Sequence, residues 1–196
     1  MRAQEPLDMV HFPETAVVSL VSRLESGHAL EVGLIGRDGV VGTALIPGIT
    51  TMACDGIVQI PGSAQRVSAD VLRGLLLANQ SLHSAFGRFV QLLLARSMQM
   101  SVCNVFHDVE RRCVRWLLAV DDLIADGEIP LTHDELALVL GVRRPTVTLV
   151  LGSLQRVGLI HERRGRIVIA DRARLEAASC ECYQVMRGEQ RRLLGY

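Results

Sequence analysis

The segment between Thr132 and Gly158 constrains the fold of this 196-residue chain more than any other part of the sequence. Thr132-His133-Asp134-Glu135 is a capping box, in which the first and last side chains bond to each other's backbone N–H and start a helix. Gly141 suits the left-handed turn after that helix, and Pro145 suits the first turn of a second helix that ends at Gly158. Apolar residues mark the inner faces of both helices: Leu136, Val139, Leu140, Val147, Val150, Leu151 and Leu154. The pattern therefore predicts a helix-turn-helix.

The residues after Gly158 indicate a wing. Residues 159–169 form two short apolar runs around an arginine-glycine turn, which predicts a β-hairpin. Arg163, Arg164 and Arg166 would then lie against DNA phosphates. Two helices joined by a turn could also form a plain helical corner, and the wing is the feature that favours a DNA-binding motif instead.

Glycine and proline divide the first third of the chain into short β-type runs. These are residues 17–21, 30–35, 40–46 and 57–60. Strands separated by so many turns predict a small antiparallel sheet or barrel.

Residues 82–107 contain no proline and a single glycine, so we expect one long helix. Five apolar residues of this segment follow a repeat with steps of three and four: Phe86, Phe89, Leu93, Met100 and Cys103. Arg96 occupies the one position of this repeat that is not apolar. Such a seam is typical of a helix that pairs with a copy of itself, and an ordinary core helix is the alternative. We expect both, with one face on the sheet and the other on a partner. Asp108 is the expected cap of a further helix, which ends near Asp126 and Gly127.

The charges of the chain are unevenly placed, although its formal net charge is zero. Acidic residues outnumber arginines before residue 80, and arginines outnumber acidic residues from 131 to 176. Local rather than total charge attracts DNA, so the second region is the expected DNA-binding surface. The sequence has neither the apolar run of a signal peptide nor an apolar stretch of membrane-spanning length. We therefore expect a cytoplasmic protein with no membrane partner.

Several stretches of the sequence resemble the Crp/Fnr family of transcriptional regulators. In the second half they are Cys103-Asn104, His107, Val109-Glu110-Arg111-Arg112, Arg115-Trp116-Leu117-Leu118, Leu131-Thr132, Leu136-Ala137, Leu140-Gly141-Val142-Arg143-Arg144, Val147-Thr148, Leu154-Gln155, Gly158-Leu159-Ile160 and Cys180-Glu181-Cys182-Tyr183. In the first half they are Phe12-Pro13, Val17-Val18-Ser19-Leu20 and residues 35–42. The resemblance covers almost the whole chain. It implies an α+β fold with a partial antiparallel β-roll, like that of cyclic-nucleotide-binding domains, a long dimerisation helix and a winged helix-turn-helix.

The resemblance also implies how the chain is divided and what it binds. We expect a β-roll effector domain in residues 1–80, a dimerisation helix in 81–107 and a DNA-binding domain in 108–196. Family members usually begin with a few dozen more residues, so we expect either a truncated β-roll or a true start upstream. The implied partners are double-stranded DNA with a palindromic operator, a second copy of the chain and, for an activator, RNA polymerase.

The start of the second helix in a helix-turn-helix reaches base edges, and the residues just before it meet phosphates. The expected DNA contacts are Arg143, Arg144, Pro145, Thr146, Thr148 and Leu149. By similarity to the family, Arg144, Pro145, Thr148 and Leu149 face the bases. Arg144 matches guanine through a bidentate contact, and a phosphate clamp is the alternative role for it. Pro145 and Leu149 differ from the polar readers that are usual in the family.

We expect neither a cofactor nor a metal, and the effector stays unknown. The phosphate of a cyclic nucleotide needs a cation, and residues 43–58 contain no arginine, lysine or glutamate. Cys180 and Cys182 are close enough to share a metal, but two residues alone are a weak signal. We therefore interpret this pair as packing of the C-terminal helix onto the wing.

The sequence thus predicts a sequence-specific DNA-binding regulator. The alternative is a winged helix that dimerises or binds a protein partner without specific DNA binding, although the uncompensated arginines argue against it. An enzyme is not expected, because the six histidines stand apart from carboxylates and cysteines and no phosphate-binding glycine loop is found.

Overall fold

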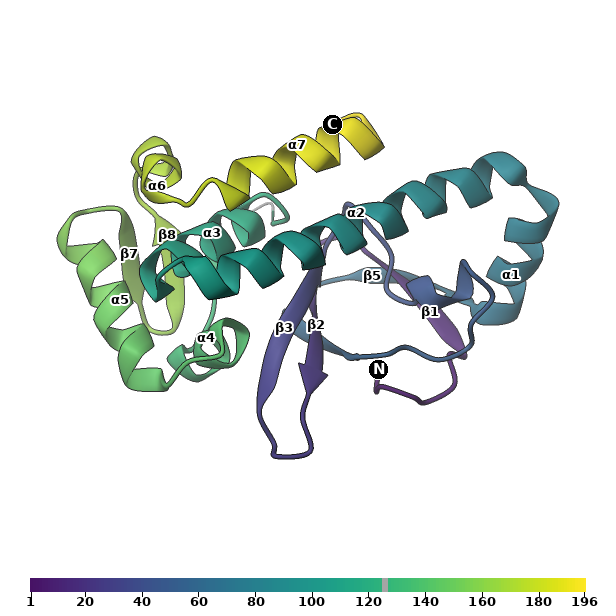
Figure 1. The fold of residues 1–196 in the computed structure, drawn as a ribbon, viewed down its shortest axis with the longest axis horizontal. Helices are drawn as coiled ribbons and strands as arrows, with labels where there is room; N and C mark the ends of the chain where they lie inside the picture. The colour runs from purple at the N-terminus through teal and green to yellow at the C-terminus, as the bar shows by residue number, and fades with distance from the viewer. Residues whose placement is uncertain (125–126) are drawn as a thin grey trace.

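The computed structural model describes residues 1–124 and 127–196 of the chain. Its central element is the 27-residue helix α2 (Gln80–Phe106), which runs from α1 at one end of the molecule to the helices of the C-terminal half (Figure 1). The N-terminal strands lie below one half of α2, and the helix-turn-helix lies near its other end. The C-terminal helix α7 (Cys182–Leu194) runs alongside α2.

The remaining elements complete an α+β fold, which confirms the expected class. The strands are β1 (Met9–Pro13), β2 (Val17–Arg23), β3 (Ala29–Ile35), β4 (Asp55–Ile60), β5 (Ala64–Ser68), β6 (Glu128–Pro130), β7 (Ile160–Arg163) and β8 (Arg166–Ile169). The other helices are η1 (Thr43–Leu45, a 3-10 turn), α1 (Ala69–Ala78), α3 (Val109–Asp121), α4 (His133–Leu140), α5 (Arg144–Arg156) and α6 (Arg172–Ala178).

The strands of the described residues form three antiparallel sheets. β1 pairs with β5, β2 lies between β3 and β4, and β8 lies between β6 and β7. The predicted strands at 17–21, 30–35 and 57–60 are confirmed. The predicted strand at 40–46 is wrong, because Val41 makes a single bridge to His11 and Gly42, at φ 116°, turns the chain into η1. β1 and β5 were not predicted, because both are short and give weak strand signals.

Side-chain caps set the ends of the long helices. Asn79 has extended backbone and its side chain accepts a backbone N–H from the first turn of α2, so α2 is separate from α1. Asp108 caps α3 as expected, with its Oδ1 2.9 Å from the N–H of Arg111. α3 ends at Asp121, earlier than the expected Asp126–Gly127, and Asp126 itself lies outside the described residues.

Two apolar cores hold the fold together. One joins the N-terminal strands to α1 and the first half of α2, and the other contains α3, α4, α5 and the wing. Val17, Leu34 and Ile60 belong to the second core although they lie on the N-terminal sheet. The sheet β3-β2-β4 therefore packs against the helix-turn-helix half of the chain.

A buried carboxyl group lies at the same junction. Glu31 on β3 is 2% exposed, and it accepts hydrogen bonds from Ser19 Oγ at 2.5 Å and from Trp116 Nε1 of α3 at 3.0 Å. Burial raises the pKa of Glu31 to about 7, although both hydrogen bonds and the charge of Arg115 act in the opposite direction. Glu31 therefore links the N-terminal sheet to α3 through a group that titrates near neutral pH.

Among the described residues, no single helix is both long and apolar enough to cross a membrane. Only α4 and α5 taken together reach that length and composition, and the two meet at a bend of 104°.

Candidate nucleic-acid interface

The helix-turn-helix consists of α4 and α5, whose angle of 104° lies within the range of this motif. The capping box is formed: the N–H of Thr132 donates to Glu135 Oε2 at 2.7 Å, and the N–H of Glu135 donates to Thr132 Oγ1 at 3.3 Å. Gly141 ends α4 at φ 63°, and Pro145 lies in the first turn of α5. All three local signals of the sequence are therefore confirmed.

The first turns of α5 present the predicted DNA contacts to solvent. Thr146 is half-buried, and the others are exposed: Arg143, Arg144, Pro145, Thr148 and Leu149. Leu149 is 75% exposed although it is apolar. The opposite face of α5 is buried through Val147, Val150, Leu151 and Leu154. Packing therefore accounts for one face of α5 and leaves the other available to a partner.

The wing is a tight hairpin between β7 and β8. Its two turn residues, Arg164 at φ 47° and Gly165 at φ 74°, both have the positive φ that a two-residue hairpin of this twist requires. Arg163 and Arg164 are exposed at the tip. Arg166 Nη1 lies 2.7 Å from Glu128 Oε2 of β6, so this arginine is already paired within the chain.

His133 joins α5 to the wing. Its Nδ1 lies 2.9 Å from Thr148 Oγ1 on α5, and its Nε2 lies 2.8 Å from Glu162 Oε1 on β7. When Nε2–H donates to the carboxylate, Nδ1 accepts the hydroxyl proton of Thr148. The Thr148 hydroxyl is therefore oriented by the chain itself. The sequence does not indicate a role for His133 or Glu162, because only the folded hairpin brings Glu162 next to α4.

Arg144 has an acidic neighbour at the start of α5. Its Nε lies 3.7 Å from Asp134 Oδ2, and both side chains are largely exposed. An exposed pair of this kind contributes about 0 to 1 kcal/mol, so the contact leaves Arg144 free to exchange Asp134 for another acceptor.

The predicted dimer seam of α2 lies inside the chain. Phe86 is half-buried and the other four residues are buried: Phe89, Leu93, Met100 and Cys103. Phe89 packs directly over Gly39, where a Cβ atom would come within 1.9 Å of the ring. Four of these residues are buried in the chain's own core and Phe86 packs against it, so we expect a dimer to use another face of α2. The periodicity was misleading because α2 has apolar residues on more than one face.

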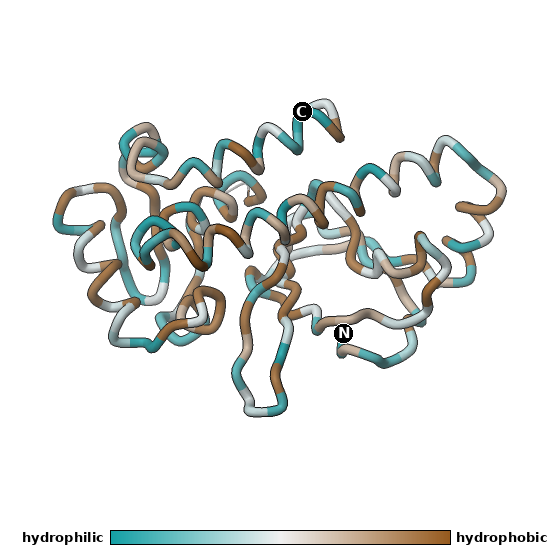
Figure 2. The backbone as a smooth tube through the Cα atoms, viewed as in Figure 1, coloured by the Kyte–Doolittle hydropathy of each residue, from teal (hydrophilic) through white to brown (hydrophobic). Residues whose placement is uncertain are grey.

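A second seam on α2 faces solvent. Residues at alternating steps of four and three are exposed, apart from a half-buried alanine: Ser84, Arg88, Gln91, Ala95, Met98, Val102 and Val105. The second half of this seam is apolar, and Val105 and the adjacent Phe106 are 74% and 78% exposed. Figure 2 shows that hydrophilic and hydrophobic residues are interspersed along α2. A seven-residue repeat of this kind is typical of helices that pair.

The expectation that Cys180 and Cys182 pack the C-terminal helix onto the wing is wrong. Both lie against the end of α2, beside Cys103 and His107. The ligand atoms of these four side chains all lie within 4.8 Å of one another. Hydrogen bonding to Cys180, with a smaller contribution from the charge of Arg115, lowers the pKa of the Cys103 thiol. No local pattern in the sequence indicates this cluster, because its two halves are far apart along the chain.

Comparisons with known proteins agree with this arrangement. Residues 111–178 match the family model of the Crp-like helix-turn-helix domain. The structure is similar to TTHB099, a CRP-family transcriptional regulator from Thermus thermophilus, with a TM-score of 0.73 and 18% identity over 91% of each chain. It is also similar to FixK2 from Bradyrhizobium japonicum, with a TM-score of 0.70 and 18% identity over 91% of each chain.

A third similar structure is the c-di-GMP-responsive global regulator CLP of Xanthomonas campestris, with a TM-score of 0.66 and 22% identity over 87% of this chain and 88% of that chain. A comparison with curated protein sequences finds no match. Residues 111–178 are therefore a Crp-like helix-turn-helix domain, and the chain as a whole has the fold of the Crp/Fnr transcriptional regulators, as its sequence resemblance predicts.

Proposed function

We propose that this protein is a sequence-specific DNA-binding transcriptional regulator that acts as a homodimer on a palindromic operator in the cytoplasm. The observation that supports this most directly is the exposed start of α5, where Arg143, Arg144 and Thr148 lie on a face that no part of the described chain covers. In a helix-turn-helix, this part of the second helix enters the major groove. Catalysis is not part of the proposal, since the similar proteins are transcriptional regulators.

The residues of α5 have distinct proposed roles. Arg144 donates to the O6 and N7 atoms of guanine, and Leu149 and the Thr148 methyl group contact thymine methyl groups. Pro145 packs against base edges beside them, while Arg143 and Thr146 hold phosphates next to the positive end of the α5 dipole. Arg163 and Arg164 at the wing tip contact the phosphate backbone, and Arg166 positions the hairpin through Glu128.

The proposed dimer uses the exposed seam of α2. Met98, Val102 and Val105 follow the heptad step and are exposed in the part of the chain that the structure describes. Pairing two copies of this seam would bury these side chains and place the two recognition helices symmetrically. That symmetry is the reason to expect a palindromic operator. RNA polymerase is a further partner if the protein activates transcription.

The test separates base reading from phosphate contact. DNA fragments are first selected from a random pool to define the preferred site. Arg144→Ala should then lose roughly 1 to 3 kcal/mol on that site and relax discrimination at one position of each half-site. Arg163→Ala/Arg164→Ala should weaken binding to all sequences alike and reduce its dependence on salt, because fewer counterions are released.

Arg156→Ala is the matched control, since Arg156 is exposed on the same helix at the end remote from the turn. It should behave as the wild type. If Arg144→Ala shows uniform loss with unchanged discrimination, Arg144 is a phosphate clamp and base reading lies elsewhere on α5. If the random pool yields no enriched sequence at moderate salt, the specific-regulator proposal is wrong and the partner-binding alternative replaces it.

A further inference from the structure

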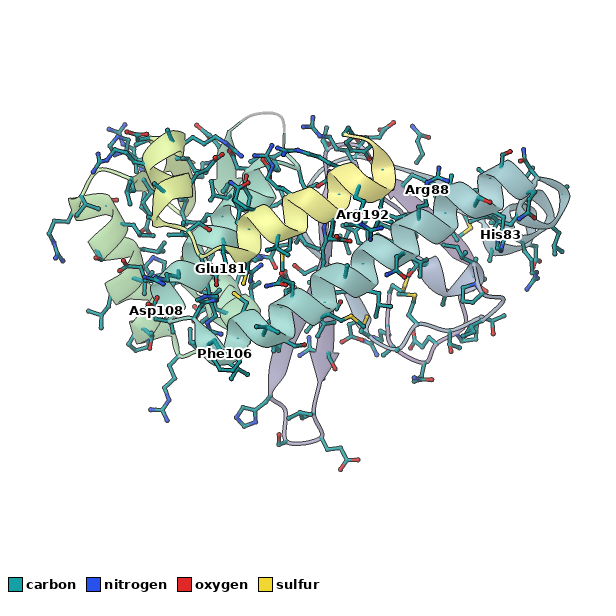
Figure 3. All side chains as sticks on the ribbon, turned by 45° about the horizontal axis from the view of Figure 1, so that its top comes forward. His83, Arg88, Phe106, Asp108, Glu181 and Arg192 are labelled. Carbon is teal, nitrogen blue, oxygen red and sulfur yellow. The ribbon has the colours of Figure 1, made fainter. Side chains whose placement is uncertain are left out.

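Four residues with metal-binding side chains meet where α2 ends and α7 begins. Cys103 lies in the last turn of α2 and His107 is the residue that ends it, while Cys180 and Cys182 flank the start of α7. Figure 3 shows Glu181, at the start of α7, close to the end of α2 that Phe106 and Asp108 mark. The three cysteines are buried and His107 is half-buried.

Two distances within this cluster match those of a tetrahedral metal site, and the others stay within 4.8 Å. Cys103 Sγ lies 3.7 Å from Cys180 Sγ, and Cys182 Sγ lies 3.6 Å from His107 Nδ1. A tetrahedral Zn²⁺ ion with its usual bond lengths holds two sulfur ligands about 3.8 Å apart and a sulfur and a nitrogen ligand about 3.6 Å apart. The Cys103 and Cys180 sulfurs are too far apart for a disulfide, which needs about 2.05 Å.

The surroundings of the cluster support metal binding as well. His107 presents Nδ1 to the cluster while its Nε2 lies 3.2 Å from Glu181 Oε2, and a carboxylate on the second ring nitrogen is the usual support of a metal-bound histidine. Gln99 Nε2 donates to Cys182 Sγ at 3.0 Å, which stabilises a thiolate. The positive charge of Arg115 acts on Cys103 and offsets part of the negative charge of three thiolates.

We propose that Cys103, His107, Cys180 and Cys182 bind one Zn²⁺ ion in a closed tetrahedral site. All four ligand atoms lie within 4.8 Å of one another, which suits a single ion, whereas the four ligands of an iron–sulfur cluster are shared among two or four irons and spread over a larger volume. Three sulfurs and one nitrogen are a common ligand set for structural zinc. The ion would connect the end of α2 to the start of α7, beside residues 107–108, which join α2 to α3. This proposal departs from the sequence-based expectation of no metal, and it does not depend on DNA binding.

The experiment measures metal binding by the full-length protein, reduced and freed of metal. Zn²⁺ content is measured after reconstitution, and Co²⁺ is used as a probe because tetrahedral thiolate coordination gives intense visible and sulfur-to-metal charge-transfer absorption. We expect one ion per chain. Cys103→Ser, Cys182→Ser and His107→Gln should weaken binding on the order of 100-fold or abolish it. Cys54→Ser is the matched control, since Cys54 lies in the N-terminal half and outside the cluster, and it should bind as the wild type.

Glu181→Gln tests the support of His107 without removing a ligand. It should weaken Zn²⁺ binding by about 10- to 100-fold and leave the thiolate charge-transfer band of the Co²⁺ form in place. Glu189→Gln, on the same helix but paired with Arg192, should have no effect. If the wild type binds no stoichiometric Zn²⁺, or if the cluster variants bind as tightly as Cys54→Ser, the proposal is wrong. Should a cysteine variant fail to fold, Glu181→Gln and His107→Gln decide the outcome.

Discussion

Replacing the buried Glu31 by glutamine should change how the stability of the protein depends on pH. The carboxyl has an ordinary pKa of 4.5 in the unfolded chain and about 7 in the folded protein, so the unfolded state releases the proton first as the pH rises. Stability from this group is fully present below pH 4.5 and is lost as the pH approaches 7. The difference corresponds to about 3 kcal/mol of unfolding free energy. Glutamine keeps an acceptor for Trp116 and a polar partner for Ser19, but it has no proton to lose.

The measurement is denaturant unfolding of the wild type and Glu31→Gln from pH 4.5 to 8 at one fixed protein concentration. The two proteins should differ little at pH 4.5, and the variant should gain up to about 3 kcal/mol relative to the wild type by pH 8. Glu25→Gln, on the exposed end of the same hairpin, should parallel the wild type throughout. Parallel curves for Glu31→Gln and the wild type would refute the assignment of a raised pKa to Glu31.

Three further variants test the dimer, the core and the capping box. Val102→Asp with Val105→Asp should convert a dimer into a folded monomer in sedimentation experiments, and a dimer that persists would contradict the exposed seam. Gly39→Ala should lower the free energy of unfolding by about 1 to 3 kcal/mol, since the new methyl group meets the Phe89 ring. A variant with the same thermal unfolding midpoint as the wild type would disprove that contact. Thr132→Ala should cost about 1 kcal/mol in the same assay, and an unchanged unfolding free energy would show that the box contributes nothing.

The elements that the sequence predicted correctly are those set by local chemistry. The capping box at Thr132, the turn at Gly141 and Pro145 in α5 each depend on neighbouring residues, and each is found in the structure. The run at 40–46 was mistaken for a strand because burial alone makes a segment apolar, whatever its backbone conformation. Only the positive φ of Gly42 distinguishes the turn from a strand.

The parts that could not be predicted depend on contacts between distant residues. α2 repeats apolar residues on two faces, and the choice between them depends on where the β-roll and α7 pack. Cys103 and Cys180 meet in the cysteine cluster although they are 77 residues apart in the sequence. No motif of nearby residues could therefore have predicted that they are in contact. The link from His133 to Glu162 likewise exists only once the hairpin has folded beside α4.

The short connection between α2 and α3 has a geometric consequence. Only His107 and Asp108 separate the two helices, so the connection is too short to let them rotate independently. The angle about the helix axis at which α2 ends therefore sets the direction in which α5 faces. Each added helical residue rotates the C-terminal half of the chain by about 100° relative to the seam. In the proposed dimer, the two copies of α5 must reach grooves about 34 Å apart on one side of the duplex. The number of residues in α2 after the seam therefore has to match the distance between the two half-sites of the operator. One residue more or fewer between Val105 and Asp108 would turn both copies of α5 away from the DNA grooves.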